Sequence, residues 1–256
     1  RGPLAERLVE GVRAAGGIWT LDDLAGYRTV EREPLRFAID TRHELIGAPP
    51  PSAGGLILAQ SLGLLQRLDW RASDGVERSH LIIESLRRAY RDRGELGDPD
   101  FVEPPLARLL APSYLDRLAA GIDRPRATPS AELLPASPWR EGEHTTHFAV
   151  MDAEGNAVAA TLSLNMMFGA AFTVPGTGVL LNDEMDDFAA DIEGSNAYGL
   201  VGSQANAIAG GKRPLSSMSP TFIESDAAMA SFGTPGGSRI PSMVLLSVLA
   251  YLEGRP

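Results

Sequence analysis

The sequence predicts an α+β fold, because helical patterns fill its first half and short alternating segments begin near residue 145. In the first half, apolar residues recur at helical spacing through residues 4–15, 56–68 and 79–93. In the second half, pairs of alternating segments joined by turns are typical of β-hairpins. A long apolar run over residues 240–252 predicts a final helix.

The helical half also contains breaks and one pair of strands. The first helix ends at Gly16-Gly17, and Thr20 offers an N-cap for a short second helix. Residues 36–47 alternate in two short pieces and predict two strands. Residues 106–120 predict two short helices separated by Pro112.

The strand-rich half begins after a segment with little periodicity. Residues 123–143 are rich in Pro, Ala, Arg and Glu, which predicts an exposed, mobile segment. A hairpin is then expected from residues 145–150 and 157–164, with its turn at 152–156. Residues 221–232 predict a second hairpin.

Composition excludes several classes of function. The 256 residues suffice for one large domain or two small ones, and the net charge is −10. A nucleic-acid binder needs a basic face for phosphates, and an anionic membrane surface would repel this chain. The chain has no cysteine, which removes disulfides, thiolate metal sites and a cysteine nucleophile. No run of about 18 apolar residues predicts a membrane helix.

The usual metal and serine-hydrolase patterns are missing. The four histidines have no metal-ligand spacing (His43, His80, His144 and His147). The acidic run from Asp183 to Asp187 lacks the spacing and the glycine of an EF-hand. No Gly-x-Ser-x-Gly elbow is present. We therefore expect no metal and no cofactor.

Thr145 is the remaining candidate nucleophile, since it follows the aperiodic segment and opens a strand. A threonine hydroxyl becomes a useful nucleophile when the chain starts at that residue, because its own α-amino group, with a pKa of about 8, can accept the proton. From the pattern alone, however, a pair such as Thr145-Thr146 at the start of a strand usually reflects only high β-propensity.

Five motifs in order resemble the gamma-glutamyltransferase family of N-terminal-nucleophile hydrolases. They are Thr145–Asp152 with Gly155–Val158, Leu164-Asn165 with Phe168-Gly169, Gly178–Phe188, Lys212–Thr221 and Gly233–Arg239. Upstream, Gly16-Gly17, Asp22–Leu24, Pro49–Gly55 and Gly97–Pro99 are similar to the later part of the family's large subunit. The resemblance implies a four-layer αββα sandwich, incomplete in this chain.

The resemblance also implies how such a protein matures and reacts. The precursor would cut itself between His144 and Thr145, so that residues 1–144 would be the end of a large subunit and residues 145–256 the start of a small catalytic subunit, forming a heterodimer. Thr145 would then take a γ-glutamyl group from glutathione or a related amide and pass it to water, an amino acid or a dipeptide. Family members from bacteria are exported, which implies a periplasmic or extracellular location.

Particular residues match the family's functional positions. Gly236 and Gly237 match the oxyanion-hole pair, whose backbone N–H groups would face a developing negative oxygen. The substrate's α-amino group would be held by one amide and two carboxylates, and its α-carboxylate by two hydroxyls. These residues are Asn165, Glu184 and Asp187 for the ammonium, and Ser216 and Ser217 for the carboxylate.

Two further matches and one departure complete the resemblance. Ser163 stands where the family has threonine, so it keeps the supporting hydroxyl without the stiffening methyl. Tyr198 matches the tip of a lid loop. The family's chain starts before Arg1, where an arginine that grips the α-carboxylate lies, and continues past Pro256, so we expect a fragment with unpaired sheet edges.

Two alternatives stay open. A cephalosporin acylase of the same family would cleave a glutaryl amide, which lacks the α-amino group that Asn165, Glu184 and Asp187 would hold. A catalytically inert homologue could instead serve as a binding module.

Overall fold

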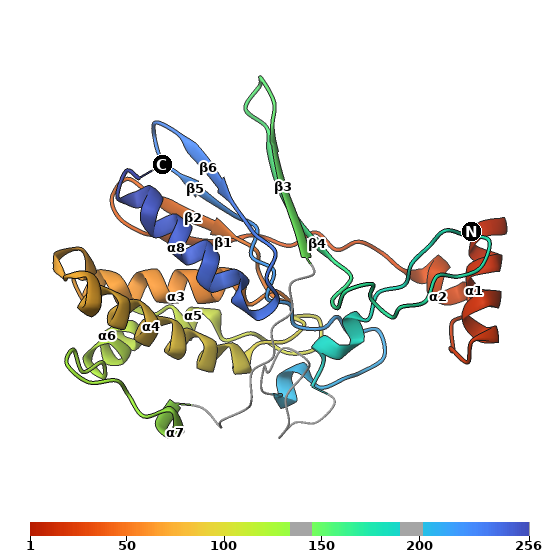
Figure 1. The fold of residues 1–256 in the computed structure, drawn as a ribbon, viewed down its shortest axis with the longest axis horizontal. Helices are drawn as coiled ribbons and strands as arrows, with labels where there is room; N and C mark the ends of the chain where they lie inside the picture. The colour runs from red at the N-terminus through yellow and green to blue at the C-terminus, as the bar shows by residue number, and fades with distance from the viewer. Residues whose placement is uncertain (134–144, 190–201, 256) are drawn as a thin grey trace.

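A four-stranded antiparallel sheet organises the structure, a computed structural model that describes residues 1–133, 145–189 and 202–255. Its strands lie in the order β1-β2-β5-β6 (Figure 1). Their bounds are Leu35–Ala38 for β1, Glu44–Gly47 for β2, Thr221–Glu224 for β5 and Met229–Phe232 for β6. The strand pairs predicted from residues 36–47 and 221–232 are therefore confirmed.

The sheet draws on both halves of the chain. At its centre β2 pairs with β5, and Leu45 lies opposite Ile223. Both side chains are completely buried. The segments before and after residue 145 therefore share one sheet and one core, so they would stay associated through burial even without a covalent link between them.

Helices cover one face of this sheet (Figure 1). The layer contains α3 (Gly54–Arg67), α4 (Gly75–Asp92), α5 (Leu106–Leu109), α6 (Pro112–Ala120) and α8 (Ile240–Leu252). Every residue of α3 from Gly54 to Leu65 is buried, because α3 packs against the sheet and against α4, α6 and α8. A buried leucine of this kind contributes roughly 1.5–3 kcal/mol to burial. Pro112 occupies the first turn of α6, where a missing N–H costs nothing.

The start of α4 differs from the prediction. The helix begins at Gly75, one turn before residue 79, because Asp74 caps it. The Asp74 carboxylate accepts hydrogen bonds from the backbone N–H groups of Val76 and Glu77 at 3.1 and 3.0 Å. Capping chemistry therefore decides the start of α4, ahead of its first buried apolar residue.

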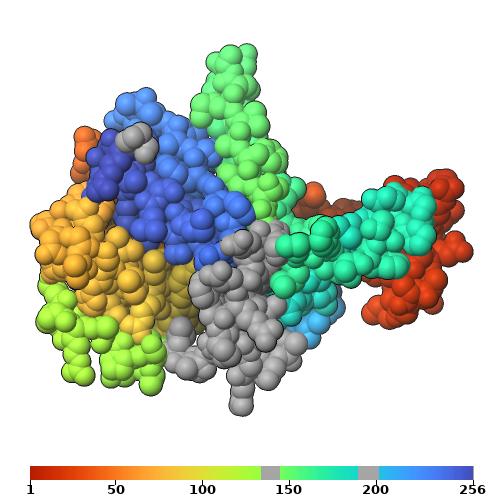
Figure 2. All heavy atoms as spheres, in the orientation of Figure 1, coloured from red at the N-terminus to blue at the C-terminus, as the bar shows by residue number. Residues whose placement is uncertain are grey.

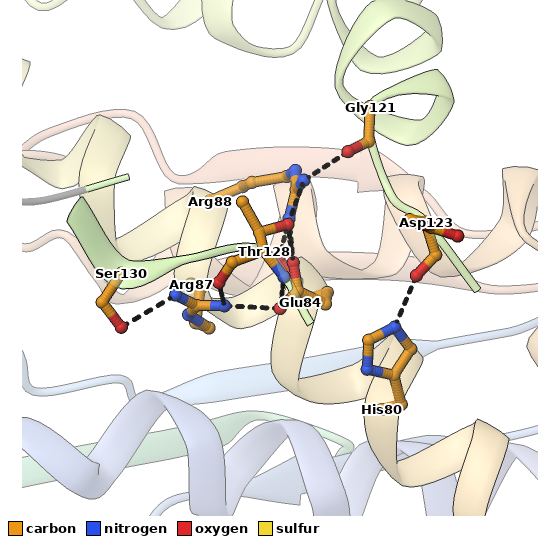
Figure 3. A network of polar contacts seen from close by, with 8 residues as sticks. All are labelled: His80, Glu84, Arg87, Arg88, Gly121, Asp123, Thr128 and Ser130. Atoms are coloured by element: carbon orange, nitrogen blue, oxygen red, sulfur yellow. Dashed lines mark hydrogen bonds and ion pairs between the residues drawn. The ribbon is translucent and has the colours of Figure 1, made fainter. Parts of the chain in front are cut away.

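Residues 123–133, the described part of the segment predicted to be exposed and mobile, are mostly exposed, as predicted, but they are hydrogen-bonded to α4. Thr128 Oγ1 donates to Glu84 on α4 at 2.6 Å, and His80 Nε2 lies 2.8 Å from the Asp123 carbonyl oxygen. The short helix α7 (Ser130–Leu133) follows, and Ser130 Oγ accepts from Arg87 (Figure 3). Polar side chains of α4 hold this segment, which a search for apolar periodicity overlooks. Residues 134–143 lie outside the described residues.

A separate two-stranded sheet carries Thr145. It pairs β3 (Thr145–Met151) with β4 (Ala157–Ser163), as predicted. The hairpin projects from the body as a narrow ridge (Figures 1 and 2). Its base lies against the chain after β6, because a Cβ on Gly233 would come within 2.1 Å of His147 Nδ1. One helical layer, one sheet and this strand pair are the parts of an αββα sandwich among the described residues.

The N-terminal helices lie at one end of the molecule (Figure 1). Helix α1 (Pro3–Ala14) packs Gly11 against Val174, which is fully buried. Helix α2 (Leu21–Gly26) begins after Thr20, the predicted N-cap, which forms a capping box with Asp23. Short 3₁₀ turns are η1 (Trp70–Ala72), η2 (Arg93–Glu95), η3 (Glu184–Asp187), η4 (Gln204–Asn206) and η5 (Gly237–Arg239). Among the described residues, no helix is both long and apolar enough to cross a bilayer.

Candidate active site

Thr145 and Ser163 lie side by side at the base of the hairpin. The strand register pairs them directly, and their hydroxyl oxygens are 3.2 Å apart. Ser163 Oγ also accepts a hydrogen bond from the backbone N–H of Asn165 at 2.9 Å. The serine hydroxyl is thus oriented toward Thr145 without the methyl of a threonine.

A small cavity opens beside this pair. Its lining unites segments that are far apart in the chain: the start of β3, the end of β4, η3, the loop before β5 and the turn before α8. The lining residues are Thr145, Ser163, Asn165, Glu184, Asp187, Ser216, Ser217, Met218, Gly237, Ser238 and Ile240. Eight of these are residues that the sequence analysis singled out.

Asn165 is held rigidly in the cavity wall. It is 2% exposed and has a φ of 70°, a left-handed conformation that asparagine tolerates better than most residues. Its Nδ2 donates to the Asp183 carbonyl oxygen at 3.2 Å, and the Asp183 carboxylate accepts from the Met166 N–H at 2.9 Å. The amide oxygen of Asn165 therefore has a defined position.

Glu184 and Asp187 stand at the two ends of the 3₁₀ turn η3. Residues three apart in a 3₁₀ turn share one face, so both carboxyls point into the same cavity. Burial raises the pKa of Glu184. Burial, and then repulsion from Glu184, raises the pKa of Asp187 to about 7. Two carboxyls in this arrangement favour either a shared proton or a bound cation.

Ser216 and Ser217 lie on a segment that is hydrogen-bonded to the residues just before α3. The Ser216 N–H donates to the Pro51 carbonyl oxygen at 2.8 Å, and the Ala53 N–H donates to the Ser216 carbonyl oxygen at 2.9 Å. Only glycine fits at position 54, where a Cβ would lie 2.3 Å from Ser219 Oγ. The Pro-rich and Gly-Gly motifs upstream therefore position the two serines.

The hydroxyl of Ser217 is available to a ligand. Ser217 Oγ is buried and has no hydrogen-bond partner among the described residues. A buried hydroxyl left unpaired costs about 1–3 kcal/mol. An anionic oxygen bound in the cavity would recover that cost.

The turn before α8 brings only one of the two predicted oxyanion glycines to the cavity wall. Gly237 lines the cavity with a φ of 55°. Gly236, with a φ of 139°, lies one residue behind and is not part of the lining. Both conformations favour glycine. The turn also lies at the N-terminal end of α8, whose dipole favours negative charge.

Two predicted residues lie outside the described residues: His144, on the leaving side of the expected cut, and Tyr198, the expected lid tip.

Sequence reasoning overlooked two buried residues behind the cavity, Arg93 and Asn206. A buried polar residue gives no periodic signal, although Arg93 does lie close to the Gly97–Pro99 motif. Within the described ranges, no group of histidine and acidic side chains is arranged to hold a metal ion.

The described residues form an α+β fold with the parts of an αββα sandwich, and a threonine at the start of a strand lies in its polar cavity. The structure resembles cephalosporin acylase from Bacillus halodurans with a TM-score of 0.79, over 99% of this chain and 44% of that one, at 23% identity. That likeness confirms the predicted fold class.

The chain belongs to the gamma-glutamyltranspeptidase family, whose model matches residues 1–255. It is 44% identical to a glutathione hydrolase proenzyme from a Pseudomonas species and 41% identical to one from Escherichia coli, in each case over 99% of this chain. It is also 35% identical to the Acylase ACY 1 proenzyme of another Pseudomonas strain. The chain spans 44% of the length of each of these relatives.

Proposed function

We propose that the protein containing this chain transfers and hydrolyses γ-glutamyl groups through an ester on Thr145. The observation that carries the proposal is the cavity itself. It gathers a hydroxyl pair, two carboxyls with an amide, and an unpaired serine hydroxyl around one space. A γ-glutamyl group offers one partner for each: an electrophilic carbonyl, an ammonium and a carboxylate.

The proposed maturation frees the α-amino group of Thr145. The Thr145 hydroxyl attacks the carbonyl carbon of His144, and the peptide C–N bond breaks as the acyl group moves to oxygen. Water then cleaves that ester, which leaves residue 145 as a new N-terminus. The α-amino group is a base near neutral pH, whereas the former amide nitrogen is not.

The proposed reaction uses the same hydroxyl. The Thr145 oxygen bonds to the γ-carbonyl carbon while its proton passes through the α-amino group to the departing amine. Ser163 orients the Thr145 oxygen, and the Gly236-Gly237 turn donates N–H groups to the oxyanion. One such donor is worth about a hundredfold to a thousandfold in rate. Water or an amine acceptor then takes the γ-glutamyl group from the ester.

The family relationship supports further parts of the proposal. Glutathione and related amides are the proposed donors, and amino acids or dipeptides the proposed acceptors. The segments on either side of residue 145 would form a heterodimer, which their shared sheet favours. We also propose a periplasmic or extracellular location, and a reaction that needs no cofactor.

The acylase alternative follows from the relative named Acylase ACY 1 proenzyme. A glutaryl group has no ammonium, so Glu184 and Asp187 would have no substrate cation to bind. Rates of the full-length protein on matched γ-glutamyl and glutaryl anilides separate the two functions. We expect a preference for the γ-glutamyl anilide, and a preference for the glutaryl anilide would contradict the proposal.

Mass spectrometry of the full-length gene product tests the chemistry directly. After incubation we expect a new N-terminus at Thr145, and after reaction with a γ-glutamyl anilide a γ-glutamyl adduct on the peptide that begins there. A protein that stays intact and binds without turnover would instead support the inert homologue.

A further inference from the structure

A buried arginine lies behind the loops that would grip the substrate. Arg93 opens η2 directly after α4 and is 5% exposed. Its Nη2 donates to the carbonyl oxygen of Leu215, the residue before Ser216, at 3.2 Å. Its buried Nε has no partner among the described residues. A buried guanidinium with an unpaired N–H is costly, so its position requires a compensating role.

Asn206 links the same loop to the carboxylate pair. Its Nδ2 donates to the Asp187 carbonyl oxygen at 2.7 Å, and its Oδ1 accepts from the Leu215 N–H at 3.0 Å. Leu215 is thus bound through its N–H by Asn206 and through its carbonyl by Arg93. This chain of bonds sets the Ser216 loop against η3, which places the two ends of a γ-glutamyl group relative to each other.

Arg93 is also a cation that acts on Asp187. Burial and the charges of Glu184 and Asp186 raise the pKa of Asp187, whereas the charge of Arg93 lowers it. Conversely, Asp187 favours the charged form of Arg93 against the effect of burial. Lys212, which lies three residues before Leu215 in the sequence, donates its hydrogen bonds to the carbonyl oxygens of Ala205 and Ala207. Two carboxylates facing one substrate ammonium leave a net charge of minus one, which the guanidinium of Arg93 cancels.

We propose that Arg93 is a positioning residue that balances the charge of Asp187 from outside the cavity and fixes the Ser216 loop through Leu215. The inference rests on the proposed function, since it assigns Arg93 to the recognition of a γ-glutamyl ammonium. Arg93 touches no substrate, and it acts on KM through Asp187 and Leu215.

The test uses the full-length, self-cleaved protein with Arg93→Met, Arg93→Lys and a control, Arg88→Met. Arg88 is also buried on α4, but it is bonded to Glu84 and to the Gly121 carbonyl oxygen. For each variant, kcat and KM on a γ-glutamyl anilide are measured across acid and neutral pH, and Tm is recorded. The α-amino group of Thr145 contributes equally to every profile, so differences between variants report on the pair of Glu184 and Asp187.

Removing the guanidinium should raise the pKa of Asp187. We expect Arg93→Met to raise KM about tenfold and to move the acid limb of kcat/KM up by about one pH unit, with cleavage at Thr145 retained. Arg93→Lys should leave the acid limb of kcat/KM where it is in the wild type, because the positive charge is kept. It should still raise KM, because an ammonium lacks the planar set of N–H donors of a guanidinium. Arg88→Met should lower Tm and leave the limb unmoved.

Two outcomes would overturn the inference while leaving the proposed function intact. One is an active Arg93→Met variant whose acid limb coincides with that of the wild type. The other, decisive if Arg93→Met does not fold, is an Arg93→Lys variant with the KM of the wild type. A wild-type protein that cleaves itself but turns over no γ-glutamyl substrate would contradict the proposed function, and this inference with it.

Discussion

Two carboxyls of this protein, buried Glu84 and half-buried Asp187, have pKa values that are shifted in opposite directions. Glu84 lies in the network behind the helical layer, and Asp187 lies in the candidate site. Despite the cost of burial, hydrogen bonds from Thr128, Arg88 and Arg87 hold the pKa of Glu84 at about 2 (Figure 3). Burial and the neighbouring Glu184 raise the pKa of Asp187 to about 7.

The two carboxyls have different neighbours. Glu84 accepts hydrogen bonds from Thr128 Oγ1 and from Arg88 Nη1, each at 2.6 Å, and pairs with Arg87 as well. Asp187 faces a second carboxyl, Glu184, whose charge raises its pKa, while the charge of Arg93 lowers it. A buried charge matched by hydrogen bonds stabilises one structure, whereas a carboxyl of raised pKa in a cavity is suited to binding a ligand. The comparison therefore distinguishes a structural network from a candidate binding site.

The largest expected effect belongs to the nucleophile. Thr145→Ala removes the hydroxyl, so neither the self-cleavage nor the γ-glutamyl ester can form. We expect an uncleaved chain on a denaturing gel and no measurable turnover, with Tm close to that of an uncleaved wild type. Cleavage of the Thr145→Ala protein at the same bond would show that another group performs the attack.

Removing the charge of Asp187 should weaken substrate binding and stabilise the fold. We expect Asp187→Asn to lower kcat/KM by about a hundredfold or more, since a charged hydrogen bond to the ammonium is lost. The raised pKa means that ionising Asp187 costs stability as pH rises from its unfolded value, about 4, through about 7. Tm of Asp187→Asn should therefore exceed that of the wild type above neutral pH and match it in acid. A lower Tm throughout would assign Asp187 a structural role.

Glu84 should show the opposite dependence of stability on pH. Its lowered pKa contributes stability that is complete above about pH 4.5 and is lost as pH falls toward about 2. Glu84→Gln should destabilise the fold by about 3 kcal/mol, because Arg88 stays buried without its counter-ion. Thermal unfolding at neutral pH and in acid measures this, and the deficit should shrink in acid. Turnover per folded molecule should be unchanged, and a shifted pH–rate profile would contradict the separation of the two regions.

The smallest effect is expected for Ser163, whose hydroxyl lies beside that of Thr145. Ser163→Thr would restore the methyl that limits rotation about χ1, so the hydroxyl beside Thr145 would be better held. We expect the rate of self-cleavage and kcat to rise about threefold or less, with KM unchanged. Single-turnover measurements resolve a change of this size. A slower reaction would indicate that the cavity has no room for the methyl.

Much of the secondary structure follows from local patterns. The hairpin of β3 and β4 was predictable because its alternation and its Asp152–Asn156 turn agree. The start of α4 was predicted one turn late, because Asp74 acts through a cap and not through an apolar stripe. Residues 123–133 lack periodicity for a related reason: hydrogen bonds to α4 hold them in place, and those partners are more than 40 residues away in sequence.

The site residues that touch the cavity could be named from sequence motifs, and the residues behind them could not. Thr145, Asn165, Glu184, Asp187, Ser216 and Ser217 lie within motifs that resemble a family, and the fold brings them to one cavity. Arg93 and Asn206 act through backbone carbonyl and N–H groups of other loops. The spacing of residues along the sequence gives no sign of such contacts.

From the sequence alone follow the local elements, the order of the motifs and the hairpin of residues 145–150 and 157–164, because these depend on neighbours within a few residues or across one turn. The folded structure alone shows that β2 and β5 join the two segments in one sheet, and that the pKa of Glu84 is lowered while that of Asp187 is raised. The acidity of a carboxyl depends on burial and on charges brought from distant parts of the chain, so it is a property of the folded molecule.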